Sequence, residues 1–265
     1  IITNKVSLRQ PEIDVAASLK LICVTATGVN NIDTAYAAQK GIAVKNVAGY
    51  STESVVQSTF ASLLALTNSI FYFDYYVKSG AYSTGPIFTH FGRTFKELSG
   101  KSFGVIGLGA IGKRVAGVAG AFGAKVSYYS TSGQNKCPDY PCLSLAELLQ
   151  QSDIVSIHAP LNEKTKNLIG YAELQTMKPT ALLVNMGRGG IVNETDLAKA
   201  LDNDLIGGAA IDVYEQEPIP DDHPYLCVKN KQKLVLTPHV AWGSVEARTR
   251  VIALTAENIE NFIRA

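Results

Sequence analysis

Two patterns of apolar residues alternate along the chain: short continuous runs, and longer stretches with apolar residues at helical spacing. The runs predict strands at 19–25, 42–44, 101–106, 124–129, 154–157, 181–185, 206–211 and 234–236. The helical spacing predicts helices at 32–39, 51–66, 115–122, 143–151, 194–202 and 248–263. Strand, helix and strand in turn form a βαβ rhythm, which predicts parallel sheets covered by helices. The sequence therefore indicates an α/β fold.

The rhythm is interrupted once, at Gly49–Thr52, before the long predicted helix 51–66. That helix should bury one face, consisting of Val55, Val56, Phe60, Leu63 and Leu64. A length of 265 residues is typical of two domains, and a hydrophobic content of 46% supports a sizeable core. We place a domain boundary near the interruption.

The charges exclude some classes of partner. The net charge is +1, and residues of both signs are spread along the chain. The chain has no basic stripe that would predict nucleic-acid binding, and it has no run of about 18 apolar residues that would predict a membrane span. The first residues, IITNKVSLRQ, read as the middle of a strand, so we expect earlier residues in the natural protein.

The cysteines predict neither a metal site nor a disulfide framework. Cys137 and Cys142 flank a Pro-Asp-Tyr-Pro segment, without a second close pair or a nearby histidine to complete a zinc site. Cys23 and Cys227 stand alone. We therefore expect free thiols in a reducing compartment, and thus a cytoplasmic protein without a bound metal.

The residues Lys101–Gly112, KSFGVIGLGAIG, hold the strongest chemical motif. A short strand leads into a G-x-G-x-x-G turn, and a helix follows it; this context makes the motif specific for a dinucleotide. Gly107 allows the tight turn, Gly109 lets a pyrophosphate approach the backbone, and Gly112 lets the helix pack on the strand. The helix N-terminus supplies free N–H groups to the phosphates.

Polar side chains collect where the predicted strands end. His158, Arg188, Asp212 and His239 each follow a strand directly or within a few residues. In open parallel sheets, ligands bind outside the carboxyl ends of the strands. The same edge should therefore carry both the dinucleotide and the reacting groups.

Other segments carry weaker signals. The aromatic stretch Phe71–Tyr76 is more consistent with packing between subunits or domains than with an aromatic cage for a ligand. The segment 82–92 should be a loop, and we expect His90 and Arg93 to have surface or interface roles. His223, in a Pro-Asp-Asp-His-Pro segment, should lie on the surface.

Taken together, these motifs resemble the D-isomer-specific 2-hydroxyacid dehydrogenase family over nearly the whole chain. The matching segments are ATGVNNID at 26–33, GLGAIG at 107–112, HAPLNEKT at 158–165, NMGRGGIV at 185–192, AIDVYEQEP at 210–218 and LTPHVAW at 236–242. Glycerate dehydrogenases and hydroxypyruvate reductases look nearest among its members.

The resemblance implies a two-domain architecture. Residues 47–242 would form a Rossmann domain with a doubly wound parallel sheet that binds the dinucleotide. Residues 1–46 and 243–265 would form a smaller, flavodoxin-like α/β substrate domain that is discontinuous in sequence and incomplete at its N-terminus. The family also implies a homodimer formed through the cofactor domain.

The resemblance assigns catalysis to Arg188, Glu217 and His239, and chemistry supports each role. Reduction of a 2-oxo acid needs a hydride from the nicotinamide and a proton for the carbonyl oxygen. A histidine, with an ordinary pKa near 6.5, suits the proton transfer, and a carboxylate partner orients its ring. The planar guanidinium of Arg188 can hold the substrate carboxylate and polarise the carbonyl.

Further contacts are implied by the same resemblance. Those with the cofactor are Gly107, Gly109, Ala110, Ile111, Gly112, Ser130, Thr131, His158, Ala159, Pro160, Thr165, Met186, Gly187, Arg188, Asp212, His239, Ala241 and Trp242. Those with the substrate are Lys5, Gly28, Val29, Arg188 and His239. The turn at Gly28 and Val29 could bind a carboxylate through its N–H groups, as a backbone nest does. The ring of His158 could equally cap a strand end, and Lys5 could be a solvated surface residue.

One position departs from the pattern of NAD enzymes. Ser130 stands 18 residues after Gly112, where an acidic residue usually binds the ribose 2′-hydroxyl. The loss of the acid removes repulsion against a 2′-phosphate, yet no arginine follows directly to bind one. We therefore leave the cofactor as NAD or NADP and expect a relaxed or NADP-tolerant site.

The sequence as a whole predicts an oxidoreductase that transfers a hydride between NAD(P)H and a small 2-oxo acid, with hydroxypyruvate or glyoxylate as the first substrates to test. One alternative is a nicotinamide-sensing protein without turnover, like the corepressors that resemble this family. Another is a relative that oxidises formate or phosphite. The three candidate catalytic residues favour the enzyme over the sensor.

Overall fold

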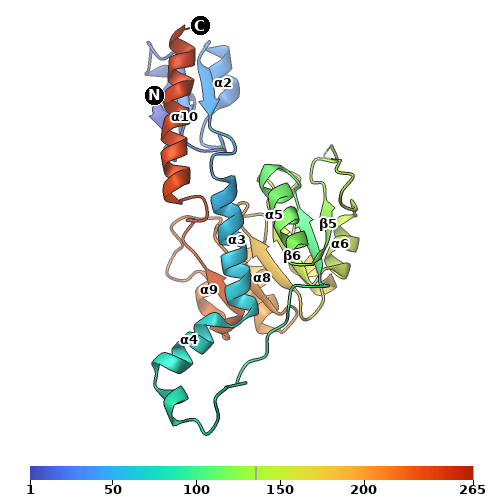
Figure 1. Cartoon of the computed structure of the whole chain (residues 1–265). Helices are drawn as coiled ribbons and strands as arrows, with labels where there is room; N and C mark the ends of the chain where they lie inside the picture. Colours follow the sequence, from blue (N-terminus) through green and yellow to red (C-terminus); the bar gives the residue numbers. More distant parts are fainter. Residues whose placement is uncertain (135, 265) are drawn as a thin grey trace. The chain divides into compact units, whose positions relative to one another are not determined.

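The computed structural model describes residues 1–134 and 136–264. The chain divides into two compact units, the smaller made of Ile1–Ser54 with Trp242–Ala265 and the larger of Val55–Ala241. Each unit has a parallel sheet of its own (Figure 1). The assignment of the larger unit to the cofactor and of the smaller unit to the substrate is a proposal.

The smaller unit combines both ends of the chain around a three-stranded sheet. Its strands are β1 (Ile2–Thr3), β2 (Leu21–Val24) and β3 (Ala43–Asn46), paired in parallel in the order β1-β2-β3. Its helices are α1 (Gln10–Asp14), α2 (Thr34–Gln39) and α10 (Val245–Arg264). Helix α10 packs beside β2, and the side chain of Asn258 donates to the Asn46 carbonyl at 3.1 Å.

The larger unit contains a six-stranded sheet in which every pairing is parallel. The strands are β4 (Ser102–Ile106), β5 (Lys125–Tyr129), β6 (Ile154–Ile157), β7 (Leu182–Asn185), β8 (Gly208–Ile211) and β9 (Leu234–Leu236). Their order across the sheet is β5-β4-β6-β7-β8-β9. The main helices are α3 (Thr52–Thr67), α4 (Ile70–Lys78), α5 (Ala110–Ala121), α6 (Leu145–Gln151), α7 (Tyr171–Thr176), α8 (Glu194–Asp202) and α9 (Pro224–Cys227).

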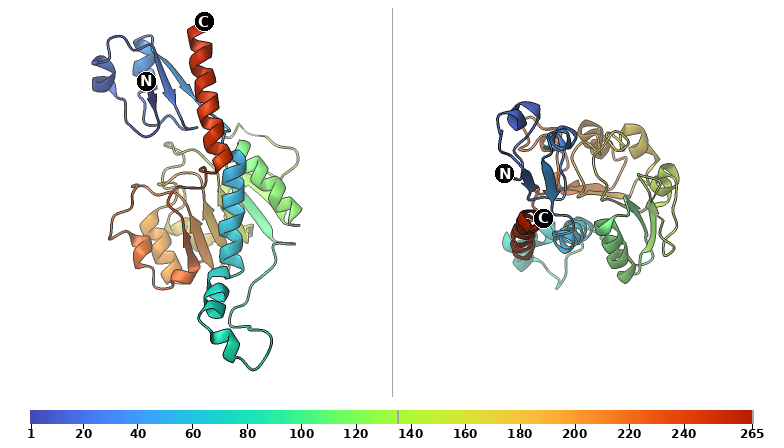
Figure 2. Two further views of the ribbon diagram at one scale, coloured as in Figure 1. Left: turned by 60° about the vertical axis from the view of Figure 1, so that its left-hand side comes forward. Right: turned by 90° about the horizontal axis from the view of Figure 1, so that it is seen from above.

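Helices cover both faces of this sheet, because successive residues of a strand point to opposite sides. Phe103 of β4 stacks on Phe60 of α3, whereas a Cβ at Gly104 would meet Leu148 of α6 on the other side. Helices α3 and α5 therefore lie on one face, and α6, α7 and α8 lie on the other (Figure 2). The result is a doubly wound sheet, as the family resemblance implies.

The strand order reverses at the middle of the sheet. The chain passes from β4 to β5 on one side and then crosses to β6 on the other side of β4. At such a switch point, the loops after the two central strands separate and leave a crevice at the carboxyl edge. The glycine turn follows β4, and His158 follows β6, so both lie at this point.

The predicted strands are all present, but the chain contains helices that the apolar pattern does not reveal. These are α1, α4, α7 and α9. Helix α4 contains mostly aromatic residues and buries none of its side chains, so it lacks the amphipathic stripe by which a helix is recognised. Helix α9 is a single turn that begins at Pro224 and is capped by His223.

By length and apolar content, no single described helix would cross a membrane. Helices α3 and α4 pass that test only when they are taken together, and a bend of 63° separates them.

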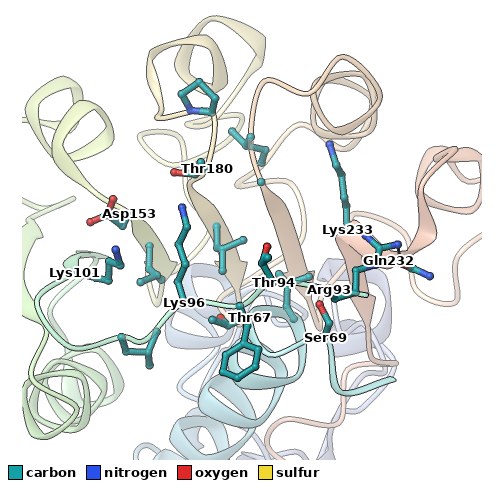
Figure 3. A pocket seen from close by; sticks show the side chains of 18 of the residues that line it. Thr67, Ser69, Arg93, Thr94, Lys96, Lys101, Asp153, Thr180, Gln232 and Lys233 are labelled. Carbon is teal, nitrogen blue, oxygen red and sulfur yellow. Dashed lines mark hydrogen bonds between the residues drawn. The ribbon is translucent and has the colours of Figure 1, made fainter. Parts of the chain in front are cut away.

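A cavity of about 470 Å³ opens at the amino edge of the larger sheet (Figure 3). Lys101, Asp153 and Thr180 line it, and each stands at or just before the start of a strand. This edge is opposite the carboxyl ends of the strands, where the candidate catalytic residues stand. The cavity is therefore separate from the candidate active site.

Candidate active site

The glycine turn after β4 has the tight geometry that its sequence predicts. Gly107 has a left-handed φ of 89°, and a Cβ there would lie 2.9 Å from the backbone of Ala159. A Cβ at Gly112 would lie 2.1 Å from the carbonyl oxygen of Gly107, so only glycine lets the helix start this close to the strand. Gly109 differs, since a Cβ there would meet nothing within 4 Å. The turn therefore presents open backbone beside the segment after β6.

Helix α5 begins at this turn and leaves its first N–H groups available. Its N-cap is Gly109, which has no side chain to accept from them, and its first turn contains no acidic residue. Ala110 at the first position is exposed. Free N–H groups and the positive end of the helix dipole form a binding site for a diphosphate. The turn thus fits the pyrophosphate of a dinucleotide.

Two buried polar atoms flank the turn without a protein partner. Among the described residues, the buried side-chain atoms that lack a hydrogen bond are Ser130 Oγ and His158 Nδ1. Ser130 follows β5 and His158 follows β6, on either side of β4. Buried polar groups are rarely left unpaired unless a ligand or water completes them. These orphaned atoms support a polar ligand, such as the adenosine part of a dinucleotide, at the switch point.

The imidazole of His158 is neutral. Its Nε2 lies 2.8 Å from Ser156 Oγ, and burial lowers the pKa of His158 to about 3. A charge on this ring would be costly in the folded protein, whereas the unfolded chain can protonate it below its ordinary pKa of about 6.5.

This difference predicts a pH-dependent stability. Because the unfolded state binds the proton more readily, the contribution of His158 is complete above pH 6.5 and is lost as the pH falls toward 3. Between pH 7 and pH 5 the loss should be about 2 kcal/mol of unfolding free energy. Urea unfolding of the wild type and of His158→Gln at both pH values measures it. An equal pH dependence in the two proteins would contradict a neutral, buried His158.

The loop after β7, which carries Arg188, is held by hydrogen bonds and by a close contact between backbones. The side chain of Asn185 accepts from the N–H of Gly187 at 3.1 Å and donates to the carbonyl of Arg188 at 3.0 Å. A Cβ at Gly189 would lie 1.9 Å from the backbone of Tyr214, so glycine is required there. This contact places the Arg188 loop against the loop after β8, which carries Glu217. The guanidinium of Arg188 donates to the Gly187 carbonyl at 2.8 Å.

Glu217 and His239 form a close pair. The Nδ1 of His239 lies 2.7 Å from Glu217 Oε2 and 2.8 Å from Oε1. The histidine side chain is 22% exposed and that of Glu217 is 27% exposed, so the pair is accessible from solvent. Since the carboxylate accepts the Nδ1 proton, the Nε2 atom of the ring is the one available to a ligand. The structure thus brings together two of the three residues proposed for catalysis.

Asp212 holds the turn on which His239 lies. Its buried carboxylate accepts from the Thr237 hydroxyl at 2.6 Å and from the N–H groups of Val240 at 2.9 Å and Ala241 at 3.0 Å. His239 has a φ of 53°, in the left-handed region. Such a conformation costs about 1 kcal/mol in a residue other than glycine and must be held by its surroundings. Asp212 therefore fixes the backbone that presents the imidazole.

The other predicted cofactor contacts lie at or near the same edge of the sheet. Ala159, after β6, packs against Gly107, and the buried Met186 follows β7 directly. Thr165 is fully buried, and its hydroxyl donates to the Pro160 carbonyl at 2.7 Å, so it stabilises the loop after β6. Pro160, Gly187 and Thr131 follow strands, Ile111 lies in the first turn of α5, and Ala241 follows His239 closely. The last predicted contact, Trp242, belongs to the smaller unit.

The predicted substrate contacts Gly28 and Val29 lie in the smaller unit, in a turn after β2. The turn is fixed through its carbonyl groups: Asn46 donates to Thr27 at 2.6 Å, and Arg9 donates to Asn30 at 2.8 Å. Lys5 is exposed shortly after β1.

The prediction for His223 is wrong: its side chain is buried. It is 4% exposed, its Nε2 lies 2.8 Å from Glu194 Oε2, and its ring packs at 5.7 Å from that of Tyr214. The Pro and Asp neighbours of His223 are typical of a surface loop, but its partner lies 29 residues earlier in the chain, at the start of α8. Glu194 and Tyr214, which the sequence does not single out, also support the loop of Glu217.

Comparisons with known proteins show to which family the chain belongs. The family model for the NAD-binding domain of D-isomer specific 2-hydroxyacid dehydrogenases matches residues 60–241. The glycerate dehydrogenase of Methylorubrum extorquens is 37% identical over 98% of this chain and 81% of its own length. The glyoxylate reductase of Aeropyrum pernix is 40% identical over 93% of this chain and 74% of its own.

A solved structure has the same fold. The D-lactate dehydrogenase of Aquifex aeolicus, complexed with NAD and lactic acid, gives a TM-score of 0.89 at 30% identity, covering 100% of this chain and 82% of its own. Sequence, fold and the glycine turn lead to one conclusion. The chain belongs to the D-isomer-specific 2-hydroxyacid dehydrogenase family, oxidoreductases that use a nicotinamide cofactor.

Proposed function

We propose that this protein reduces a small 2-oxo acid to the D-2-hydroxy acid with NAD(P)H, or catalyses the reverse reaction. The observation that supports this proposal most is the Glu217–His239 pair, joined at 2.7 Å at the same edge of the sheet as the glycine turn. Hydroxypyruvate and glyoxylate are the first substrates to test, because relatives of this chain are named glycerate dehydrogenase and glyoxylate reductase.

The proposed roles follow from the chemistry of the three side chains. The bound nicotinamide supplies the hydride to the carbonyl carbon. His239 gives the Nε2 proton to the carbonyl oxygen while Glu217 holds the ring and stabilises its charged form. Arg188 binds the substrate carboxylate through its planar guanidinium. The reaction in the opposite direction uses the same groups, with His239 accepting the proton.

The test is turnover by the purified protein. NADH and NADPH are each mixed with hydroxypyruvate, glyoxylate, pyruvate and phosphohydroxypyruvate, and the absorbance of the reduced nicotinamide is followed. Rapid loss with one acid supports the proposal and identifies the substrate. Binding of the cofactor without turnover of any acid would reject it, and would favour a nicotinamide sensor or a different small anion as substrate.

We further propose that the site accepts NADPH. Ser130 replaces the usual acid, so nothing at this position repels a 2′-phosphate, and its buried hydroxyl has no partner among the described residues. Thr131 and Ser132 add further hydroxyl groups beside it. The same assay compares the two cofactors, and a hundredfold preference for NADH would contradict the proposal.

A homodimer is the third part of the proposal. Around α4 and the segment after it, Phe71, Tyr75, Phe88 and Phe91 are 65%, 73%, 90% and 82% exposed. Together they present on the order of 600 Å² of aromatic side chain, close to the ~800 Å² that each partner of a stable complex buries. A molar mass in solution of twice that of one chain is expected from light scattering. A monomer at micromolar concentration would contradict it. The cytoplasmic location remains a prediction.

A further inference from the structure

Glu194 connects helix α8 to the loop that carries Glu217. It is the first residue of the helix, and its side chain is 13% exposed. One carboxylate oxygen, Oε1, accepts the backbone N–H of Glu215 at 2.8 Å. The other, Oε2, lies 2.8 Å from Nε2 of His223. Both oxygens are therefore engaged, and both partners belong to the segment between β8 and β9.

The orientation of His223 fixes which atom donates to Glu194. The N–H of Tyr225 points to Nδ1 of His223 at 3.3 Å, so Nδ1 accepts and the ring proton is on Nε2. That proton is donated to Glu194 Oε2. The ring is also packed at 5.7 Å from Tyr214 and at 4.9 Å from Tyr225. His223 is thus locked in place and holds the Glu194 carboxylate in one position.

The short segment from Tyr214 to Glu217 links this anchor to the candidate catalytic pair. The N–H of Tyr214 donates to Glu217 Oε1 at 3.1 Å, and the next N–H, that of Glu215, donates to Glu194. The Tyr214 hydroxyl donates to the carbonyl of Thr237 at 2.9 Å, two residues before His239. We infer that Glu194, held by His223, is a positioning residue that sets the geometry of the Glu217–His239 pair.

The surroundings of Tyr214 support this inference. Burial, followed by the charges of Asp212, Glu217 and Glu194, raises the pKa of Tyr214 to about 12, so its hydroxyl remains a donor to Thr237. The three carboxylates therefore lie around one tyrosine. Asp212 holds the turn of His239, Glu217 orients its ring, and Glu194 holds the backbone between them. The inference rests on the proposed function, since it assigns Glu194 to the support of the proton-transferring pair.

Replacement of Glu194 by glutamine tests the anchor with little change in shape. Glutamine has one acceptor oxygen, yet two donors face this position, the Glu215 N–H and the His223 Nε2–H. One of them would lose its acceptor, and the segment 214–217 would shift. Because a misplacement near 1 Å at a reacting group can cost about 100-fold, a partial shift should lower kcat by about tenfold.

The experiment combines turnover with an NMR signal. The Nδ1–H proton of His239, hydrogen-bonded to Glu217, is assigned in the free protein by its loss in His239→Asn. In Glu194→Gln we expect this resonance to move or broaden, and kcat to fall about tenfold with an unchanged KM for the cofactor. His223→Phe should have the same effects as Glu194→Gln. His223→Gln, which keeps a donor, should retain most of the wild-type kcat and a His239 resonance close to that of the wild type. The matched control is Glu173→Gln, since Glu173 also accepts a backbone N–H, that of Gly170 at 3.0 Å, but in α7.

Three results would separate the positioning role of Glu194 from the proposed function and from general destabilisation. An unchanged His239 resonance in both Glu194→Gln and His223→Phe overturns the positioning role, whatever the turnover. If the wild type turns over no acid, the proposed function fails, yet the NMR comparison still decides whether Glu194 positions the pair. A similar loss in Glu173→Gln would indicate general destabilisation and would also overturn the inference.

Discussion

Replacement of His239 by asparagine should lower kcat for 2-oxo acid reduction by about 10² to 10⁴. The side chain of asparagine cannot donate a proton to the developing alkoxide, so the step must depend on water. Asparagine is the preferred replacement because His239 has a φ of 53°, a left-handed conformation that asparagine adopts more readily than alanine. The backbone of the turn should therefore be preserved, and the loss of activity can be assigned to the imidazole. Steady-state kinetics by nicotinamide absorbance measure the effect.

Cofactor affinity serves as the internal control for this variant. The glycine turn follows β4, the second strand from one side of the sheet, whereas His239 follows β9, the strand at the opposite side. Although the resemblance counts His239 among the cofactor contacts, the phosphate-binding turn is unchanged in this variant, so binding of NADPH, measured by fluorescence, should change by less than about threefold. Glu217→Gln should also lower kcat, and the double variant should be little worse than His239→Asn, because paired groups act as a unit. Full activity in His239→Asn would show that another group supplies the proton.

The sequence predicts the position of a residue well where that residue follows a strand directly. Every strand of the larger sheet appears as an apolar run, and a parallel sheet brings all its carboxyl ends to one edge. The polar residues that follow those runs are therefore expected at one edge of the sheet, and His158 and Asp212 do follow strands of this sheet. The glycines at 107 and 112 are equally informative, since their spacing reflects steric limits that the structure reproduces.

Side chains that act through distant partners could not be predicted in this way. The burial of His223 depends on Glu194, which is 29 residues away, and no local pattern relates the two. Helix α4 is missed for a different reason: it consists mostly of aromatic residues and none of its side chains is fully buried, so apolar spacing does not mark a core-facing side. The exposed residues Phe71 and Tyr75 of this helix are part of the basis of the homodimer proposal.

Asp212 has a structural role in addition to its predicted contact with the cofactor, and its replacement by asparagine should have the second largest effect. The resemblance counts this residue among the cofactor contacts, and in the structure its carboxylate accepts hydrogen bonds from Thr237, Val240 and Ala241. An amide has a single acceptor oxygen, so at least one of these donors would face an NH₂ group. Hydrogen bonds to a charged group contribute about 1.5–3 kcal/mol each, and we expect a loss of about 2–4 kcal/mol in unfolding free energy.

The same variant should lower kcat by about 10–10², because the strained turn at His239 loses the group that holds it. If Asp212 acts through this turn, the affinity for NADPH should stay within about threefold, and kcat should carry the effect. A large loss of cofactor affinity with an unchanged kcat would instead assign the residue to the nicotinamide. Asp153→Asn is the matched control, since Asp153 also accepts a backbone N–H, that of Ser102 at 2.9 Å, but at the amino edge of the sheet. Its turnover should equal that of the wild type, because the opposite edge of the sheet carries the proposed chemistry.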